Sequence, residues 1–286
     1  PKDTGSRTFG AALVFAGVAM RSCVALCLVA FTIAAPVYSH DLWIVPGKFA
    51  VQPGEKIRVF INSGDTFPVS DALLNVVRVG SLTFHPTLSE GIEITSFASD
   101  GMSLTAEVTA TEPGTAAVTL ALEPRVIRLK AEEFNQYLAE EGLSTLLELR
   151  QASGESNEPA VERYTKWAKS LLSVGDESDD RWSEPTGLKL EVVPHAPPRT
   201  LRRGATLPFV ILFEGKPLAE VTVVGGRAGT PAHRVRTVTD SNGAASVVLP
   251  EAGRWYLRAL HVIRLRDDPE AQWESFWTTI TFEVQA

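Results

Sequence analysis

The chain has 286 residues, more than one compact core usually fills, so two domains are expected. It carries 27 lysine and arginine residues against 34 aspartate and glutamate residues, a formal net charge of −7. This acidic balance, without a long basic run, argues against binding to nucleic acid or to anionic membrane surfaces.

Residues 1–39 are interpreted as a leader followed by a secretory signal peptide. A basic start at Met20-Arg21 is followed by the apolar run 24–35 and by a small residue, Ser39. The apolar run is shorter than the roughly 20 residues that cross a membrane as a helix. We therefore expect a periplasmic or secreted protein that does not insert directly into a membrane after signal cleavage.

Cleavage after Ser39 would make His40 the first residue of the exported protein. A terminal histidine can bind a metal ion through its α-amine and its imidazole together, so His40 is a candidate metal ligand. In the alternative, cleavage occurs elsewhere, for example after Ala34, and His40 only begins a strand. Both cysteines, Cys23 and Cys27, precede this point, so metal ligands are expected to be nitrogen and oxygen atoms.

The segment 40–129 is predicted to form an N-terminal antiparallel β-sandwich. Short runs of β-branched and aromatic residues alternate with turn residues, as at Pro53-Gly54 and Glu112-Pro113-Gly114. Strands are expected at 56–61, 74–79, 104–108 and 116–122.

The segment 130–185 is predicted to be a helical connection. Good helix formers and apolar residues three or four positions apart predict helices over 131–141 and 143–151. The same spacing predicts a further helix over 160–172.

The segment 186–286 is predicted to form a second, C-terminal β-sandwich, which makes the chain mainly β. Alternating runs return here and are separated by turns such as Asp240-Ser241-Asn242-Gly243. Strands are expected at 188–193, 207–213, 221–224, 234–239, 245–249, 255–265 and 273–284.

His261 and Glu274 lie on the apolar faces of the last two predicted strands. If these strands form a hairpin around Asp267-Asp268-Pro269, the two residues face each other, with Cβ atoms about 4.5–5.5 Å apart. They would then share a metal ion, or form a hydrogen-bonded pair in the core. The other histidines are expected to be solvent-facing residues of loops: His85, His195 and His233.

Several motifs recur together along the chain: His40-Asp41-Leu42-Trp43, Phe134-Asn135-Gln136-Tyr137-Leu138, Glu162-Arg163-Tyr164, Leu212-Phe213-Glu214-Gly215-Lys216-Pro217-Leu218, Leu260-His261 and Trp273-Glu274-Ser275-Phe276-Trp277. As a set they resemble a family of exported bacterial proteins of unknown function that is grouped with NikM-type nickel-uptake substrate-specific components. The resemblance implies two immunoglobulin-like sandwiches, the second similar to carboxypeptidase-regulatory or transthyretin-like domains. It also implies periplasmic handling of nickel or cobalt linked to uptake.

The resemblance implies a ligand set as well. Carried over by position, it points to His40 and to His261 with Glu274. Many relatives have a histidine where this chain has Asp65, so Asp65 is expected to act as an oxygen ligand. The implied ion is nickel or cobalt, with copper or zinc as alternatives, and the implied partner is a membrane metal-uptake transporter.

Two other functions remain open. One is a structural or adhesive module that binds a protein or glycan partner, in which His261 and Glu274 form a core pair. The other is a copper oxygenase that uses the N-terminal histidine. The sequence has no nucleophile elbow, phosphate-binding glycine loop or paired-histidine helix motif, so an enzyme is not expected.

Overall fold

The computed structural model describes residues 40–87 and 90–286, and these form one compact unit. The predicted leader and signal peptide, residues 1–39, lie outside the described residues. The strands are β1 (Asp41–Pro46), β2 (Ala50–Val51), β3 (Glu55–Gly64), β4 (Val79–His85), β5 (Ile92–Glu93), β6 (Ala98–Asp100), β7 (Ser103–Ala110), β8 (Gly114–Leu122), β9 (Arg125–Leu129), β10 (Ala160–Val174), β11 (Leu190–Pro194), β12 (Thr206–Phe213), β13 (Lys216–Pro217), β14 (Thr222–Arg227), β15 (Thr230–Val238), β16 (Ala244–Val248), β17 (Gly253–Arg264) and β18 (Trp273–Val284). The helices are α1 (Ala131–Glu141) and α2 (Ser144–Ala152), with short 3-10 turns η1 (Val76–Arg78), η2 (Arg181–Ser183) and η3 (Pro198–Thr200).

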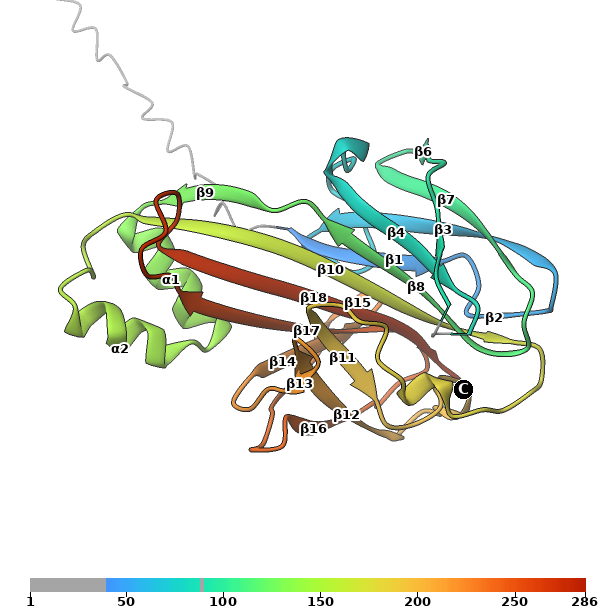
Figure 1. Ribbon diagram of the computed structural model, residues 1–286. Helices are drawn as coiled ribbons and strands as arrows, with labels where there is room; N and C mark the ends of the chain where they lie inside the picture. The colour runs from blue at the N-terminus through green and yellow to red at the C-terminus, as the bar shows by residue number, and fades with distance from the viewer. Residues whose placement is uncertain (1–39, 88–89) are drawn as a thin grey trace, which may run out of the picture. The chain divides into compact units, whose positions relative to one another are not determined.

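Within the described residues the strands form three sheets (Figure 1). The first sheet has the order β1-β3-β7-β6. The central sheet has ten strands and runs β15-β14-β17-β18-β10-β8-β4-β5, with β2 and β9 also paired to β10. The third sheet contains β11, β12, β13 and β16. The chain is therefore mainly β, as the sequence predicted.

Two large apolar cores lie on opposite faces of the central sheet, and β10 contributes to both. Ala168 and Leu172 point into the core shared with the first sheet. Trp167 and Leu171 alternate with them and point into the core shared with the third sheet. Alternation along a strand sends successive side chains to opposite faces, so one strand joins the two halves of the molecule.

The helices α1 and α2 cover the part of the central sheet that the first sheet leaves open (Figure 1). They agree with the predicted helices, and Gly142 separates them at a φ of 80°, a left-handed conformation that favours glycine. The predicted helix over 160–172 is wrong, because that segment is strand β10. The predicted strand over 74–79 is also wrong: most of it is loop and the short turn η1.

A buried ion pair joins the third sheet to the central sheet. Lys169 Nζ of β10 lies 2.6 Å from Glu191 Oε1 of β11, and both side chains are 1% exposed. The Glu191 carboxylate also accepts hydrogen bonds from the backbone N–H groups of Thr186, Gly187 and Leu188. One carboxylate thus holds the loop before β11 on β10. None of the described helices has the length and apolar character needed to cross a membrane.

Candidate metal centre

The pairing of β1 with β3 brings His40 to Asp65. The two strands are antiparallel, with Asp41 opposite Gly64 and Leu42 opposite Ser63. One further step of the same register places His40 opposite Asp65, where facing Cβ atoms are about 4.5–5.5 Å apart. Two of the residues predicted as ligands therefore meet at the start of β1.

A third acidic side chain, Asp71, reaches the same place through the loop that follows β3. The loop returns to β3 at an isolated bridge between Ser63 and Ala72. Asp71 Oδ2 then accepts a hydrogen bond of 2.7 Å from the backbone N–H of Asp65. One ligand atom from each of His40, Asp65 and Asp71 lies within 4.8 Å of the other two.

Gly64 leaves the space that Asp71 occupies. A Cβ atom at this position would lie 2.6 Å from Asp71 Oδ2 and 2.5 Å from the carbonyl oxygen of Val69. Contacts this short require one side to move, and the Val69 carbonyl belongs to the backbone. The absence of a side chain at Gly64 is therefore part of the geometry of the cluster.

The loop carrying Asp65 and Asp71 is anchored at its centre by Phe67. The Phe67 ring packs against Trp43, with ring centroids 5.5 Å apart, and against Tyr256 at 5.0 Å. Asn62 Nδ2 donates a hydrogen bond of 2.7 Å to the carbonyl of Pro68. The aromatic contacts and this hydrogen bond hold the two carboxylates on a structured loop rather than on a free one.

A buried lysine and a partly buried arginine support the segment around His40. The Lys166 ammonium donates to the His40 carbonyl oxygen and lies 5.3 Å from the Trp277 ring. Burial lowers the pKa of Lys166 to about 8. On the neighbouring residue, Asp41 Oδ1 lies 3.5 Å from Nε of Arg258. Burial opposes the charge of Arg258, but the nearby carboxylates outweigh it and hold its pKa above the ordinary value.

His261 and Glu274 do not face each other as predicted. In the hairpin of β17 and β18, Glu274 lies opposite Ile263 and His261 lies opposite Phe276, a shift of two residues from the predicted register. The His261 ring contacts Phe213, with ring centroids 4.8 Å apart. Burial lowers the pKa of His261.

The central sheet separates His261 from His40. The hydroxyls of Thr279 and Thr281 on β18 donate to the carbonyls of Leu42 and Ile44, so β1 lies over that face of the sheet. His261 shares the opposite face with Phe276, whose ring is stacked on it. The structure therefore brings together His40 and Asp65 of the predicted ligands, and leaves His261 and Glu274 on the other face of the sheet.

The remaining histidines give a mixed result. His85 ends β4 and is buried, with Nε2 2.9 Å from Thr119 Oγ1, so its prediction as a solvent-facing loop residue is wrong. His195 is exposed, as predicted. The side chain of His233 lies outside the described ones.

The cluster has the donors of a divalent metal site. It contains one imidazole and two carboxylates at the edge of a sheet. Because both aspartates are exposed to solvent, a bound ion would have coordination positions left for further ligands. Imidazole suits nickel, copper, zinc and iron, and carboxylates bind divalent ions generally. Asp71 was missed because its approach depends on the path of the loop. The only signal in the sequence is that Asp65 and Asp71 flank a short segment containing a proline.

Comparisons with known proteins give a family and little else. Residues 37–263 match the model of a family described as a domain of unknown function, DUF4198. No curated protein matches the chain. Among solved structures, the D0-D1 domain of Intimin is 11% identical, with 85% of this chain and 97% of that chain covered and a TM-score of 0.23.

Two further solved structures are similarly distant. FdeC, an Escherichia coli adhesin, is 16% identical, with 87% of this chain and 65% of that chain covered and a TM-score of 0.25. Trypsin-activated alpha-2-macroglobulin from Escherichia coli is 9% identical, with 88% and 16% covered and a TM-score of 0.24.

Proposed function

The chain belongs to the DUF4198 family of domains of unknown function, and we propose that it binds a divalent transition-metal ion through His40, Asp65 and Asp71. The observation that carries the proposal is the approach of three ligand atoms to within 4.8 Å of one another, one from the residue before β1 and two from an anchored loop. Because this loop is already held in place, less conformational entropy is lost when an ion binds. The proposal keeps two of the ligands predicted from sequence and replaces His261 and Glu274 with Asp71.

The proposed ion is nickel or cobalt, with copper and zinc as competitors. A site with an imidazole favours these ions over calcium and magnesium, which prefer oxygen ligands alone. If the protein is exported and cleaved before His40, the α-amine of His40 adds a fourth donor. The function we propose is handling of the ion in the periplasm or outside the cell, with delivery to a membrane uptake transporter.

Isothermal titration with nickel, cobalt, zinc and magnesium tests the proposal. The variants D65N and D71N keep an oxygen acceptor and remove the negative charge. Each is expected to weaken nickel binding by roughly 10-fold or more, since loss of even an outer-shell partner costs about 10- to 100-fold. The matched control is D100N, because Asp100 is an exposed aspartate paired loosely with Arg58 at 3.4 Å. Equal nickel binding by all three variants and the wild type would contradict the proposal.

The contribution of the α-amine is tested separately. A chain that begins at His40 is compared with one that carries an additional glycine before it. The first is expected to bind nickel more tightly, and both should bind more weakly at pH 5 than at pH 7, because imidazole and amine bind metals unprotonated. Equal affinity of the two chains would remove the amine from the site and leave the three side chains.

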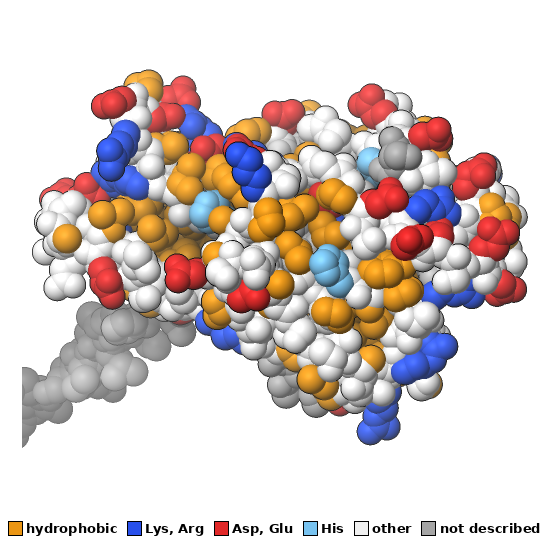
Figure 2. Space-filling view, turned by 60° about the horizontal axis from the view of Figure 1, so that its bottom comes forward, with side chains coloured by type: hydrophobic (Ala, Val, Ile, Leu, Met, Phe, Trp, Pro, Cys, Tyr) orange, Lys and Arg blue, Asp and Glu red, His pale blue; other side chains and the backbone are white. Residues whose placement is uncertain are grey.

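An adhesive module is the second candidate, and exposed apolar side chains favour it. Val69, Leu73 and Val77, near the metal cluster in sequence, are 53%, 47% and 73% exposed. The face shown in Figure 2 also carries patches of hydrophobic side chains with histidines among them. Such patches often mark contact with a partner. Partner capture that is unchanged by metal removal and by D71N would favour this function over the first.

A further inference from the structure

A pocket lies where two strands of the central sheet part. β10 and β18 run in parallel from the pair Glu162–Trp273 to the pair Ser170–Thr281. Beyond that point β10 pairs with β2, at Ser173 and Ala50. Directly after β18, Gln285 forms an isolated parallel bridge with Arg202. The fork between the strands holds a pocket of about 240 Å³.

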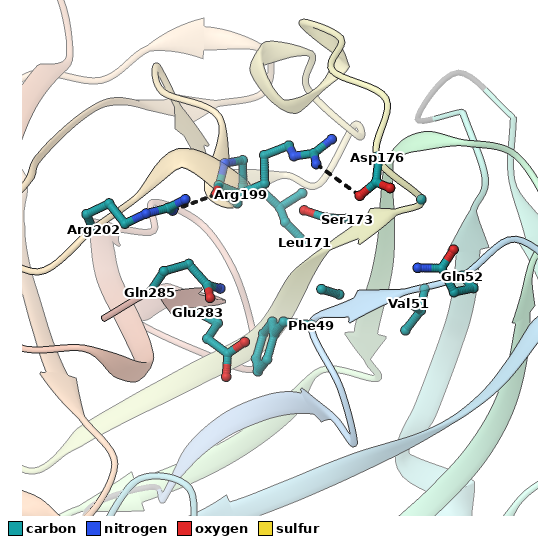
Figure 3. Close-up of a pocket in the computed structure, with 13 residues that line it drawn as sticks. Phe49, Val51, Gln52, Leu171, Ser173, Asp176, Arg199, Arg202, Glu283 and Gln285 are labelled. Carbon is teal, nitrogen blue, oxygen red and sulfur yellow. Dashed lines mark hydrogen bonds and ion pairs between the residues drawn. The ribbon is translucent and has the colours of Figure 1, made fainter.

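The pocket combines apolar residues with opposite charges. Phe49 and Leu171 form the apolar floor of the pocket, where their 5% and 2% exposed side chains show only an edge to a ligand. Figure 3 shows the Arg202 guanidinium on one side of the pocket, with the Glu283 carboxylate beside the Phe49 ring on the other. A ligand in the fork therefore meets a cation, an anion and an apolar surface together.

Neither of these charged side chains forms an ion pair with another side chain that the structure describes. The Arg202 Nη1 donates to the backbone carbonyls of Arg199, at 2.9 Å, and Leu201, at 3.3 Å. The backbone contacts orient the guanidinium but leave its charge available to an anion. Glu283 lies opposite Arg254 in the pairing of β17 with β18, but Arg254 donates to the carbonyl of Gly47, so the Glu283 carboxylate can still accept from an ammonium group.

We propose that this fork binds a free α-amino acid with an apolar side chain. The carboxylate of the amino acid pairs with Arg202, its ammonium group pairs with Glu283, and its side chain lies against Phe49 and Leu171. The volume is below the roughly 300–1,000 Å³ of pockets that hold drug-sized ligands, so a ligand of this small size is appropriate. The site is separate from the metal cluster, and this proposal does not depend on metal binding.

Isothermal titration calorimetry of the full chain with L-leucine, L-valine and L-phenylalanine tests the proposal. At least one of them is expected to bind with a dissociation constant of about 1 mM or below. R202Q and E283Q are each expected to weaken that binding by roughly 10- to 100-fold, the effect of losing a hydrogen bond to a charged group. R203Q is the matched control, since Arg203 is the next residue, is exposed and does not line the pocket.

Two analogues of leucine separate a zwitterion site from a simple anion site. 4-Methylpentanoate lacks the amine, and 3-methylbutylamine lacks the carboxylate. Both are expected to bind at least 10-fold more weakly than L-leucine, if L-leucine is the amino acid that binds. The proposal is overturned if none of the three amino acids binds, if 4-methylpentanoate binds as tightly as L-leucine, or if R203Q lowers affinity as much as R202Q.

Discussion

Replacing Lys169 with methionine tests the ion pair that joins the third sheet to the central sheet. The substitution leaves the carboxylate of Glu191, which is 1% exposed, without the ammonium group that lies 2.6 Å from it. Removing one partner of a buried pair costs roughly 3–5 kcal/mol. We therefore expect the free energy of unfolding of K169M, measured by urea titration with tryptophan fluorescence, to fall by about 3–5 kcal/mol at pH 7.

The same variant has an expected pH dependence. Burial by itself raises the pKa of Glu191, but Lys169 and the N–H donors outweigh it, so the pKa lies below the ordinary value of 4.5. The resulting stabilisation is complete above about pH 4.5 and is lost as the pH falls through the lowered pKa. Without Lys169 this loss in acid should shrink, so the gap between K169M and the wild type should narrow at low pH.

The control for K169M is K48M. Lys48 also pairs with a glutamate, Glu55, at 2.5 Å, but its side chain is 66% exposed. Exposed pairs contribute about 0–1 kcal/mol, so K48M should change the free energy of unfolding by less than about 1 kcal/mol. If K169M and K48M cost the same, the reasoning from burial is refuted.

Three further predictions concern the ligand loop, the helices and β10. F67A removes the anchor of the ligand loop, so it should cost up to about 3–5 kcal/mol of stability and weaken nickel binding in calorimetry; unchanged affinity would show that the loop keeps its shape without Phe67. R150M removes the donor to the carbonyls of Glu155 and Glu158. R150M should lower the free energy of unfolding by at least about 2 kcal/mol and speed proteolysis of the loop between α2 and β10. A cleavage rate equal to that of the wild type would argue against this role of Arg150. Burial raises the pKa of Glu162 to about 7, so its contribution to stability falls as the pH rises from 4.5 through 7. In urea unfolding, the free energy of unfolding of E162Q should therefore rise relative to that of the wild type by up to about 3 kcal/mol between pH 4 and pH 8. A difference between the two proteins that does not change with pH would contradict the raised pKa of Glu162.

The sequence predicted the β-rich character and both α-helices, but not β10. Alternation of polar and apolar residues identifies a strand when one of its faces meets water. In β10, Trp167 and Leu171 enter one core while Ala168 and Leu172 enter the other. Because both faces of β10 carry apolar residues, the polar–apolar alternation of a half-buried strand is absent. The spacing of the apolar residues then resembles that of a helix.

The candidate site was predicted in part for a different reason. His40 and Asp65 were named from a terminal histidine and a family resemblance, and the pairing of β1 with β3 brings them together. His261 and Glu274 were joined by assuming a symmetric turn. In the structure the backbone N–H of Leu265 instead donates to the carbonyl of Gln272. The strand register therefore differs by two residues from the predicted one, and His261 lies opposite Phe276. Turn length fixes strand register, and the sequence alone did not supply that length.

The dual role of β10 has a consequence for how the molecule comes apart. Peeling this strand from either neighbour strips apolar side chains from both cores at once. A fragment that contains only one of the two cores is not expected to fold by itself. Without β10 it lacks part of its core, and with β10 it exposes the apolar side chains that the strand buries in the other core. Unfolding of the described part of the chain should accordingly be a single all-or-none event, in which the first and third sheets lose their structure together.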